Sequence, residues 1–326
     1  MPAKQFISLT ALAIVLFGVS GCATQVGVKR TSEVAVYRQL TASVLTGKNP
    51  SSYSMQFLQR LNLVEQYGRN PKQVLTQLHE GLGGVDEHDR LFALSELSYA
   101  CAGKKQEQSY FLAAALYAYL FLFPDDAGKA PIPHDPRLRL AMDLYNSSIK
   151  DGLQKPKGDE VDLKAGRFVL PFGSLDLSLE PSGFLYGGYK LVHFVSVADL
   201  EVRGFRNRYR KPGIGAPLSA QVERTEGHAG DKWITRQSKV PVTVFVRFDQ
   251  PRSALSTGEL TGKIELYNVD EIPAVNLGGH SVPLEFDPSA ALAYRLEGSP
   301  LWDFEIAGFR RGDFSLFGKK IGRAHV

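Results

Sequence analysis

Five basic side chains gather between residues 203 and 211, namely Arg203, Arg206, Arg208, Arg210 and Lys211. An arginine guanidinium can form two parallel hydrogen bonds with a carboxylate or a phosphate. The favoured interpretation is a structural network, in which these cations pair with carboxylates across a domain contact. The alternative is a contact with an anionic ligand, for which lipid headgroups are suitable.

A serine hydrolase needs a nucleophile beside a base, and G-x-S-x-G at a strand-to-helix turn is the usual carrier. This sequence contains no such pentapeptide. The nearest approach is residues 279–283, where Pro283 stands in place of the second glycine. We therefore interpret Ser281 as a loop residue and predict no catalytic residue in this chain.

Two histidines lie among acidic residues around the loop that joins two predicted helices, in the set His79, Glu80, Asp86, Glu87, His88 and Asp89. Their spacing matches no zinc-binding pattern, and acidic residues commonly gather at helix ends as caps. Gly213 and Gly215 lack the third glycine and the βαβ setting of a dinucleotide site, so they indicate a turn. The sequence predicts no metal and no cofactor.

The N-terminus has the order of a secretory targeting segment. Lys4 precedes an apolar stretch from Phe6 to Val19, which is too short to span a bilayer as a helix. Small residues then lead to Cys22, in a pattern that resembles the lipobox of bacterial lipoproteins. This resemblance implies a signal peptide over residues 1–21, acylation of Cys22, and attachment to a membrane through the acyl chains.

Residues 22–30 form a short polar tether. Ala23 follows the cysteine, and this favours sorting to the outer membrane, facing the periplasm. Once Cys22 is acylated, Cys101 is the only other cysteine, so no internal disulfide is available. Stability must then come from burial of the apolar residues, which make up 44% of the chain. The net charge of +4 is weak support for an acidic partner, and we expect no nucleic acid partner for an exported protein.

Residues 31–155 show helical periodicity and predict an α-helical bundle. The predicted helices are 32–46, 52–67, 71–82, 88–103, 105–123 and 136–153. The range 105–123 is apolar nearly all round, so it should be the central helix. Hairpins of this length are compatible with tetratricopeptide-like repeats, but no clean repeat period is present, and an irregular bundle is preferred.

Residues 156–320 are predicted to form a second, β-rich domain. Alternating apolar residues occur at 168–170, 189–197, 240–248 and 260–269, separated by Gly- and Pro-rich turns. The pattern favours an antiparallel sandwich or an open barrel, which gives an α+β fold class overall. Asp287 and Pro288 should begin a short helix, as N-cap and first-turn residue.

Residues 201–218, EVRGFRNRYRKPGIGAPL, resemble a segment of large bacterial lipoproteins that carry an α/β-hydrolase domain at the C-terminal end. Residues 282–287, VPLEFD, and residues 302–309, WDFEIAGF, are similar to further segments of that family. The resemblance covers residues 30–320. It implies that a V-H-G loop of the hydrolase domain follows soon after the position of Phe317, and that residues 301–317 pack on that domain. It also implies ester hydrolysis by a Ser-His-Asp mechanism in the parent protein.

The sequence thus predicts the accessory N-terminal part of a membrane-anchored, esterase- or lipase-like bacterial α/β-hydrolase, without the catalytic domain. The alternative is a complete envelope scaffold or binding lipoprotein without enzymatic activity. Residues 321–326, IGRAHV, resemble a translated sequencing-adapter read, and we expect them to be an artefact.

Overall fold

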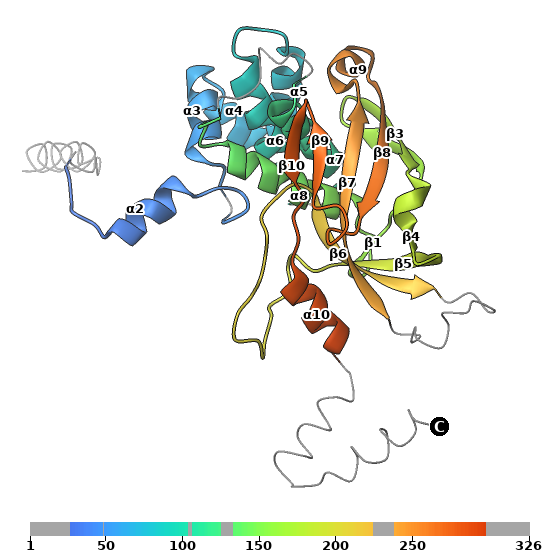
Figure 1. The fold of residues 1–326 in the computed structure, drawn as a ribbon. Coiled ribbons are helices and arrows are strands. Elements are labelled where there is room, and N and C mark those ends of the chain that lie inside the picture. The colour runs from blue at the N-terminus through green and yellow to red at the C-terminus, as the bar shows by residue number, and fades with distance from the viewer. Residues whose placement is uncertain (1–26, 48, 104–105, 125–132, 224–237, 298–326) are drawn as a thin grey trace, which may run out of the picture. The chain divides into compact units, whose positions relative to one another are not determined.

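The computed structural model in Figure 1 describes residues 27–47, 49–103, 106–124, 133–223 and 238–297. The chain divides into two compact units, residues 1–41 and residues 42–326. The described part of the first unit contains helix α2 (Glu33–Leu40), which is shorter than the predicted range. The Ser32 side chain caps this helix by accepting a hydrogen bond from the backbone N–H of Ala35 at 3.3 Å.

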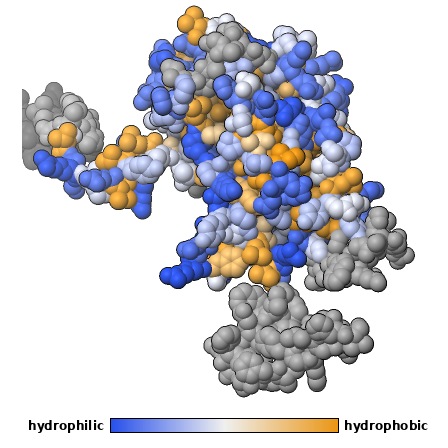
Figure 2. All heavy atoms as spheres, in the orientation of Figure 1, coloured by the Kyte–Doolittle hydropathy of each residue, from blue (hydrophilic) through white to orange (hydrophobic). Residues whose placement is uncertain are grey.

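Helix α2 has no buried side chain. Its large apolar residues are exposed (Figure 2), and they are Val34, Val36, Tyr37 and Leu40. An isolated helix of this length is marginal in water, because few hydrogen bonds offset the cost of nucleation. The cap at Ser32 is therefore an important local contribution to its stability.

The second unit begins with helices α3 (Ser52–Arg60), α4 (Val64–Arg69), α5 (Pro71–Glu80), α6 (Glu87–Gly103), α7 (Gln108–Leu122) and α8 (Leu138–Leu153). These ranges agree with the prediction within a few residues, with one exception. The predicted helix 52–67 is divided into α3 and α4, because Asn62 adopts a left-handed conformation with φ of 54°.

Helix α7 lies at the centre of the helical part, as its composition predicted. Its side chains from Phe111 to Leu122 are all buried. Helices α6 and α8 pack along it, and the short connection from Gly103 to Gln108 makes α6 and α7 a helical hairpin. Within the described ranges, no helix is both long enough and apolar enough to span a membrane.

The β-rich part contains β1 (Glu160–Val161), β2 (Gly166–Leu170), β3 (Gly173–Leu179), the short helix η2 (Pro181–Phe184), β4 (Leu185–Tyr186), β5 (Tyr189–Ser196), β6 (Ala216–Glu223), β7 (Lys239–Asp249) and β8 (Glu259–Tyr267). The strands form an eight-stranded sheet in the order β1-β5-β6-β7-β8-β3-β2, with β4 paired to β5. Helix α9 (Pro251–Thr257) connects β7 to β8.

The sheet differs from the predicted antiparallel sandwich or open barrel in two respects. Strand β3 runs parallel to β8, with Leu175 opposite Leu260, so the sheet is mixed. Among the described strands, β1 and β2 remain at opposite edges, and no barrel closes. Helices α7 and α8 cover one face by packing against β2, β1 and β6, so helices take the place of a second sheet there. The α+β class itself is confirmed.

After β8, the chain forms the hairpin of β9 (Ala274–Leu277) and β10 (His280–Pro283), and then helix α10 (Pro288–Leu296). The predicted start of this helix is confirmed. Asp287 is the N-cap, its side chain accepts a hydrogen bond from the backbone N–H of Ala290 at 2.9 Å, and Pro288 is in the first turn.

One hydrophobic cluster runs through the helical and β-rich parts. It includes Leu116 and Tyr145 from the helices, and Leu218, Val244 and Ile264 from the sheet. The regions on either side of residue 156, predicted as separate domains, therefore share a core.

Tyr145 of α8 contacts β7 on the side that faces β6, beyond the point where the pairing of these two strands ends. Its hydroxyl donates to the backbone carbonyl of Val246 at 2.6 Å and accepts from the N–H of Val246 at 2.9 Å. Val246 lies two residues beyond Val244, the last β7 residue that pairs with β6. The hydroxyl thus satisfies backbone groups that β6 does not reach.

Replacing Tyr145 with Phe should lower the free energy of unfolding by about 1–3 kcal/mol, because a buried N–H and a buried C=O lose their partner. Urea denaturation measures the change. The control is Tyr53→Phe, since Tyr53 is only partly buried and its ring lies edge-on to Phe92. Equal stability of Tyr145→Phe and wild type would contradict this role of the hydroxyl.

Candidate functional site

Two arginines of the basic run pair with buried carboxylates. Arg208 Nε donates to Asp287 Oδ2 at 3.1 Å, and Arg210 Nε donates to Glu285 Oε1 at 3.0 Å. The two carboxylate side chains are 0% and 1% exposed, whereas the arginine side chains are 37% and 38% exposed. Because an unpaired buried carboxylate is very costly, these pairs belong to the structure of the fold. These two pairs are structural, as the sequence favoured, but they join two segments of the predicted β-rich domain and do not cross a domain contact.

Asn146 of α8 connects the same network to the helical part. Its amide nitrogen donates to the Gly213 carbonyl and to Glu285 Oε2, both at 2.9 Å. Its amide oxygen accepts from the backbone N–H of Gly215 at 2.6 Å. The Thr243 hydroxyl of β7 donates to the Glu285 carbonyl at 2.5 Å. A helix, a turn, a strand and the segment before α10 therefore meet around Glu285.

The two glycines of this turn are required by geometry. A Cβ on Gly213 would lie 2.4 Å from the carbonyl oxygen of Pro283, and Gly215 has φ of +96°. Only glycine fits such close backbone approach and adopts this conformation without strain. The turn that the sequence predicted here is thus a close contact with residues 283–285.

The other members of the basic run are exposed. Arg203 pairs with Glu201 at 2.8 Å, and both side chains are largely in solvent. Lys211 contributes its backbone, which exchanges hydrogen bonds with Phe286 at 2.8 and 3.0 Å. Arg206 is exposed on the same segment. Contact of the five residues with an anionic group stays a prediction, and Arg203, Arg206 and Lys211 are the members whose side chains face solvent.

Ser281 lies in strand β10 with an exposed side chain, so its assignment to a loop is corrected. Among the described strands, β10 pairs with β9 alone, and Ser281 is opposite Asn276. Such a short, separate hairpin had too few alternating residues to be recognised in the sequence. Cys22 and residues 301–317, the other predicted sites, lie outside the described residues.

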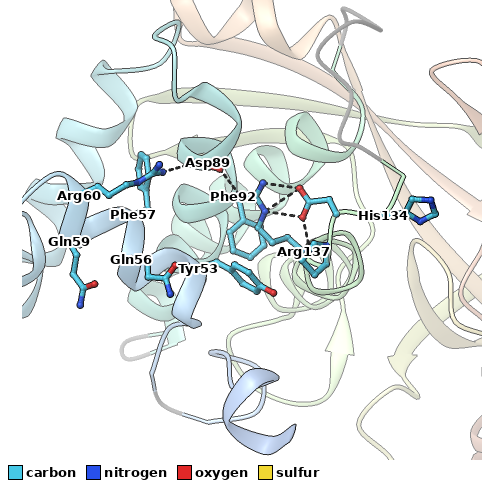
Figure 3. Close-up of a pocket in the computed structure, with 11 residues that line it drawn as sticks. Tyr53, Gln56, Phe57, Gln59, Arg60, Asp89, Phe92, His134 and Arg137 are labelled. Carbon is cyan, nitrogen blue, oxygen red and sulfur yellow. Dashed lines mark hydrogen bonds and ion pairs between the residues drawn. The ribbon is translucent and has the colours of Figure 1, made fainter. Parts of the chain in front are cut away.

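A groove of about 740 Å³ opens between α3, the start of α6 and the residues that precede α8 (Figure 3). Tyr53, Phe57 and Phe92 supply its aromatic surface. Polar groups come from the remaining lining residues, including Gln56, Gln59, Arg60, Asp89, His134, Asp135 and Arg137. The described lining contains no serine, threonine or cysteine, so it lacks the nucleophiles that serine- and cysteine-type hydrolases use.

Arg137 is held at the floor of the groove by two carboxylates and two rings. Its guanidinium donates to Asp89 Oδ1 at 2.6 Å and to Asp135 Oδ2 at 2.8 Å. The same group lies 5.5 Å from the centroid of Phe92 and 5.3 Å from that of Phe121. Its charge is therefore satisfied within the protein.

The carboxylates of this network are stabilised as anions. Burial alone would raise the pKa of Asp135, but hydrogen bonds from Arg137 outweigh it and lower the pKa below the ordinary value. Asp89 behaves in the same way, with hydrogen bonds from Arg137 and Arg60. Arg60 itself is 56% exposed, so it is the cation of the groove that a bound partner can reach.

His88 lies behind this network and is stacked on Phe121 with ring centroids 4.1 Å apart. Its Nε2 is 3.6 Å from Asp135 Oδ2, beyond ordinary hydrogen-bond distance. Burial, followed by the charge of Arg137, lowers the pKa of His88 below its usual 6.5. The neutral imidazole is thus favoured in the folded state.

This shift predicts a loss of stability in acid. The folded-state pKa of His88 lies below the unfolded value of 6.5. The stabilisation that the neutral ring gives the folded state is therefore complete above pH 6.5, and it is lost as pH falls through the folded pKa. Replacing His88 with Phe keeps the ring stack and should reduce the decline in unfolding free energy between pH 7 and pH 5. His134→Phe is the control, because His134 is exposed. An unchanged decline in His88→Phe would contradict the assignment.

His79, the other histidine of the acidic cluster, is also part of the core. Its Nδ1 lies 2.7 Å from the Tyr117 hydroxyl, and its ring stacks on Phe172 with centroids 4.3 Å apart. Burial lowers the pKa of His79 below 6.5. Within the part of the chain that is described, no group of three or more His, Cys, Asp or Glu side chains is placed to hold a metal ion.

Comparisons of this chain with protein-family models, with curated proteins and with solved structures find no match.

Proposed function

We propose that this chain is the accessory N-terminal part of a lipid-anchored bacterial α/β-hydrolase of the esterase or lipase type. In this proposal it performs no catalysis itself. Its roles are to connect the membrane anchor to the hydrolase domain and to present residues 301–317 to that domain.

The observation that carries the proposal is the mutual contact of two segments that resemble the hydrolase lipoproteins. Residues 201–218 and 282–287 are far apart in sequence, yet they form backbone bridges at Lys211–Phe286 and Ile214–Leu284. The pairs of Arg208 and Arg210 with the buried carboxylates join the same two segments. The resemblance thus coincides with one structural unit, which leads directly into α10.

The proposed location is the bacterial envelope, on the periplasmic face of the outer membrane. It requires removal of residues 1–21 and acylation of Cys22, with residues 22–30 as the tether. Growth of a bacterium that expresses the chain with an alkyne-labelled palmitate should label the protein. The Cys22→Ala variant should lose the label, and Cys101→Ala should keep it, because Cys101 is buried. Labelling that persists in Cys22→Ala would exclude this anchor.

The absence of catalysis in the chain alone can be tested directly. Purified protein should hydrolyse p-nitrophenyl acetate and p-nitrophenyl butyrate no faster than buffer. Ester hydrolysis that disappears in Ser281→Ala, but persists in Ser253→Ala as a control for an exposed serine, would contradict the proposal.

A binding function is the second candidate, and the groove in Figure 3 is the observation that favours it. In this alternative the helical hairpins, arranged in the manner of tetratricopeptide-like repeats, hold an envelope partner. The partly buried ring of Tyr53 would contact apolar groups of that partner, and Arg60 would pair with a carboxylate.

A photo-crosslinking amino acid at Gln56, in the groove, should then give a defined adduct in the envelope fraction that is lost in Arg60→Ala. The same crosslinker at Gln77, on α5 and outside the groove lining, should give none. Adducts of equal yield at both positions would exclude a specific role for the groove.

A further inference from the structure

A smaller pocket, of about 220 Å³, lies on the face of the sheet that α10 covers. Its polar lining comes from β1, β5, β6, β7 and α10, as the set Glu160, His193, Ser219, Gln221, Lys239 and Tyr294. The strand register explains the arrangement. Val195 is opposite both Glu160 and Ser219, so these side chains lie in one row across three strands.

A register shift in β5 sets the direction of the His193 side chain. The register with β6 shifts between Val192 and Val195, and His193 has φ of 51°. A bulge of this kind re-aims a side chain, and a left-handed non-glycine residue carries strain. The imidazole Nδ1 lies 2.7 Å from Glu160 Oε1. Since a carboxylate only accepts, Nδ1–H donates to Glu160, and Nε2 is the second ring nitrogen that can contact a ligand.

Ser219 supplies a buried polar group beside this histidine. The residue is 2% exposed, and its hydroxyl has no hydrogen-bond partner in the described part of the chain. Buried hydroxyl groups usually have a partner, so an unpaired one in the lining of a pocket is a candidate contact for a ligand.

Lys239 is the cation of the pocket. Its ammonium donates to the Tyr294 carbonyl at 3.2 Å and lies 3.5 Å from the centroid of the Tyr294 ring. No described carboxylate forms an ion pair with it. Glu160, in contrast, is paired with Lys155 and His193, so the acidic group of the pocket is balanced.

The pocket lining therefore contains both hydrogen-bond donors and hydrogen-bond acceptors, and the charges of Glu160 and Lys239 offset each other. An anion would meet Glu160, and a cation would meet Lys239, whereas a neutral hydroxyl group can both donate and accept. The volume is below the roughly 300–1,000 Å³ of sites for drug-sized ligands. We propose that this pocket binds a neutral polyhydroxylated ligand the size of one sugar ring, with Lys239 and Ser219 as donors and His193 Nε2 as a third contact. The proposal is independent of the hydrolase proposal.

Saturation-transfer NMR on the full chain, with N-acetyl-D-glucosamine and D-glucose as probes, tests this site. At least one sugar should receive saturation, and the dissociation constant should rise about fivefold in Ser219→Ala, the effect of one lost hydrogen bond. Ser196→Ala is the matched control. Ser196 is in the neighbouring strand, and its buried hydroxyl has no hydrogen-bond partner among the described residues, but it does not line the pocket. The Ser196→Ala variant should therefore bind the sugar as tightly as wild type.

A third variant tests the histidine while the bulge is kept. Asparagine tolerates the left-handed conformation, so His193→Asn should fold and bind the sugar more weakly than wild type. Thermal unfolding of each variant confirms that the protein is folded. The proposal is overturned if neither sugar binds, if Ser219→Ala and Ser196→Ala bind equally well, or if acetate or phosphate binds in preference to both sugars.

Discussion

Replacing Asn146 with Ala should lower the free energy of unfolding by about 2–4 kcal/mol, one of the largest effects of a single substitution in this protein. Asn146 makes three hydrogen bonds, to Gly213, Gly215 and Glu285, and it is 7% exposed. Without the amide, a buried carbonyl, a buried N–H and a carboxylate oxygen lose their partners. Guanidinium or urea denaturation measures the loss.

The matched control is Ser148→Ala, two residues further along the same helix. Ser148 is also fully buried, but its hydroxyl has no hydrogen-bond partner among the described residues. Its removal should change the unfolding free energy by less than about 0.5 kcal/mol, because no hydrogen bond is broken. Similar losses in both variants would mean that Asn146 acts through packing alone and that the network around Glu285 contributes little.

Replacing Glu96 with Ala should destabilise the protein by about 3 kcal/mol, because this carboxylate organises the entry into the helical part. Glu96 is 0% exposed. Its Oε1 accepts from the backbone N–H of Val44 at 3.3 Å and of Ser51 at 2.8 Å. Its Oε2 accepts from the hydroxyls of Ser51 and Ser54, both at 2.6 Å. Alanine would leave all four donors without this acceptor.

Glu96→Gln separates hydrogen bonding from side-chain volume. The glutamine oxygen can still accept from the two N–H groups, and its amide can donate to hydroxyls that reverse their role. The loss should therefore be smaller than in Glu96→Ala. Limited proteolysis provides a second measurement, with faster cleavage near residues 42–51 in Glu96→Ala. If alanine and glutamine destabilise equally, the hydrogen bonds do not account for the role of Glu96.

The helices could be predicted because helix formation depends mainly on residues that are close together in the sequence. The apolar character of residues 111–122 identified the central helix, and the Asp287-Pro288 pair identified the start of α10. Strand β6 was missed, since Ala216, Pro217 and Ser219 do not give a β-forming pattern although the strand is buried. The parallel pairing of β3 with β8 joins segments far apart in sequence, and no short-range pattern reports it.

The candidate sites were predictable only in part, for the same reason. The arginine spacing indicated a structural network, but Glu285 lies 75 residues from Arg210 and Asp287 lies 79 from Arg208. The groove brings residues of α3 and α6 together with Arg137, and the polar pocket joins four strands and α10. Such sites depend on tertiary contacts, and no local sequence pattern marks the residues that form them.

The central claim is that the chemistry of this protein resides in a hydrolase domain encoded with it. Sequencing the native gene beyond codon 320 is the most direct test. We predict an open reading frame that encodes a V-H-G loop and then a G-x-S-x-G motif. A termination codon in the native gene directly after codon 320, just past the Phe317 region, would contradict the claim and leave the binding lipoprotein as the account of this chain.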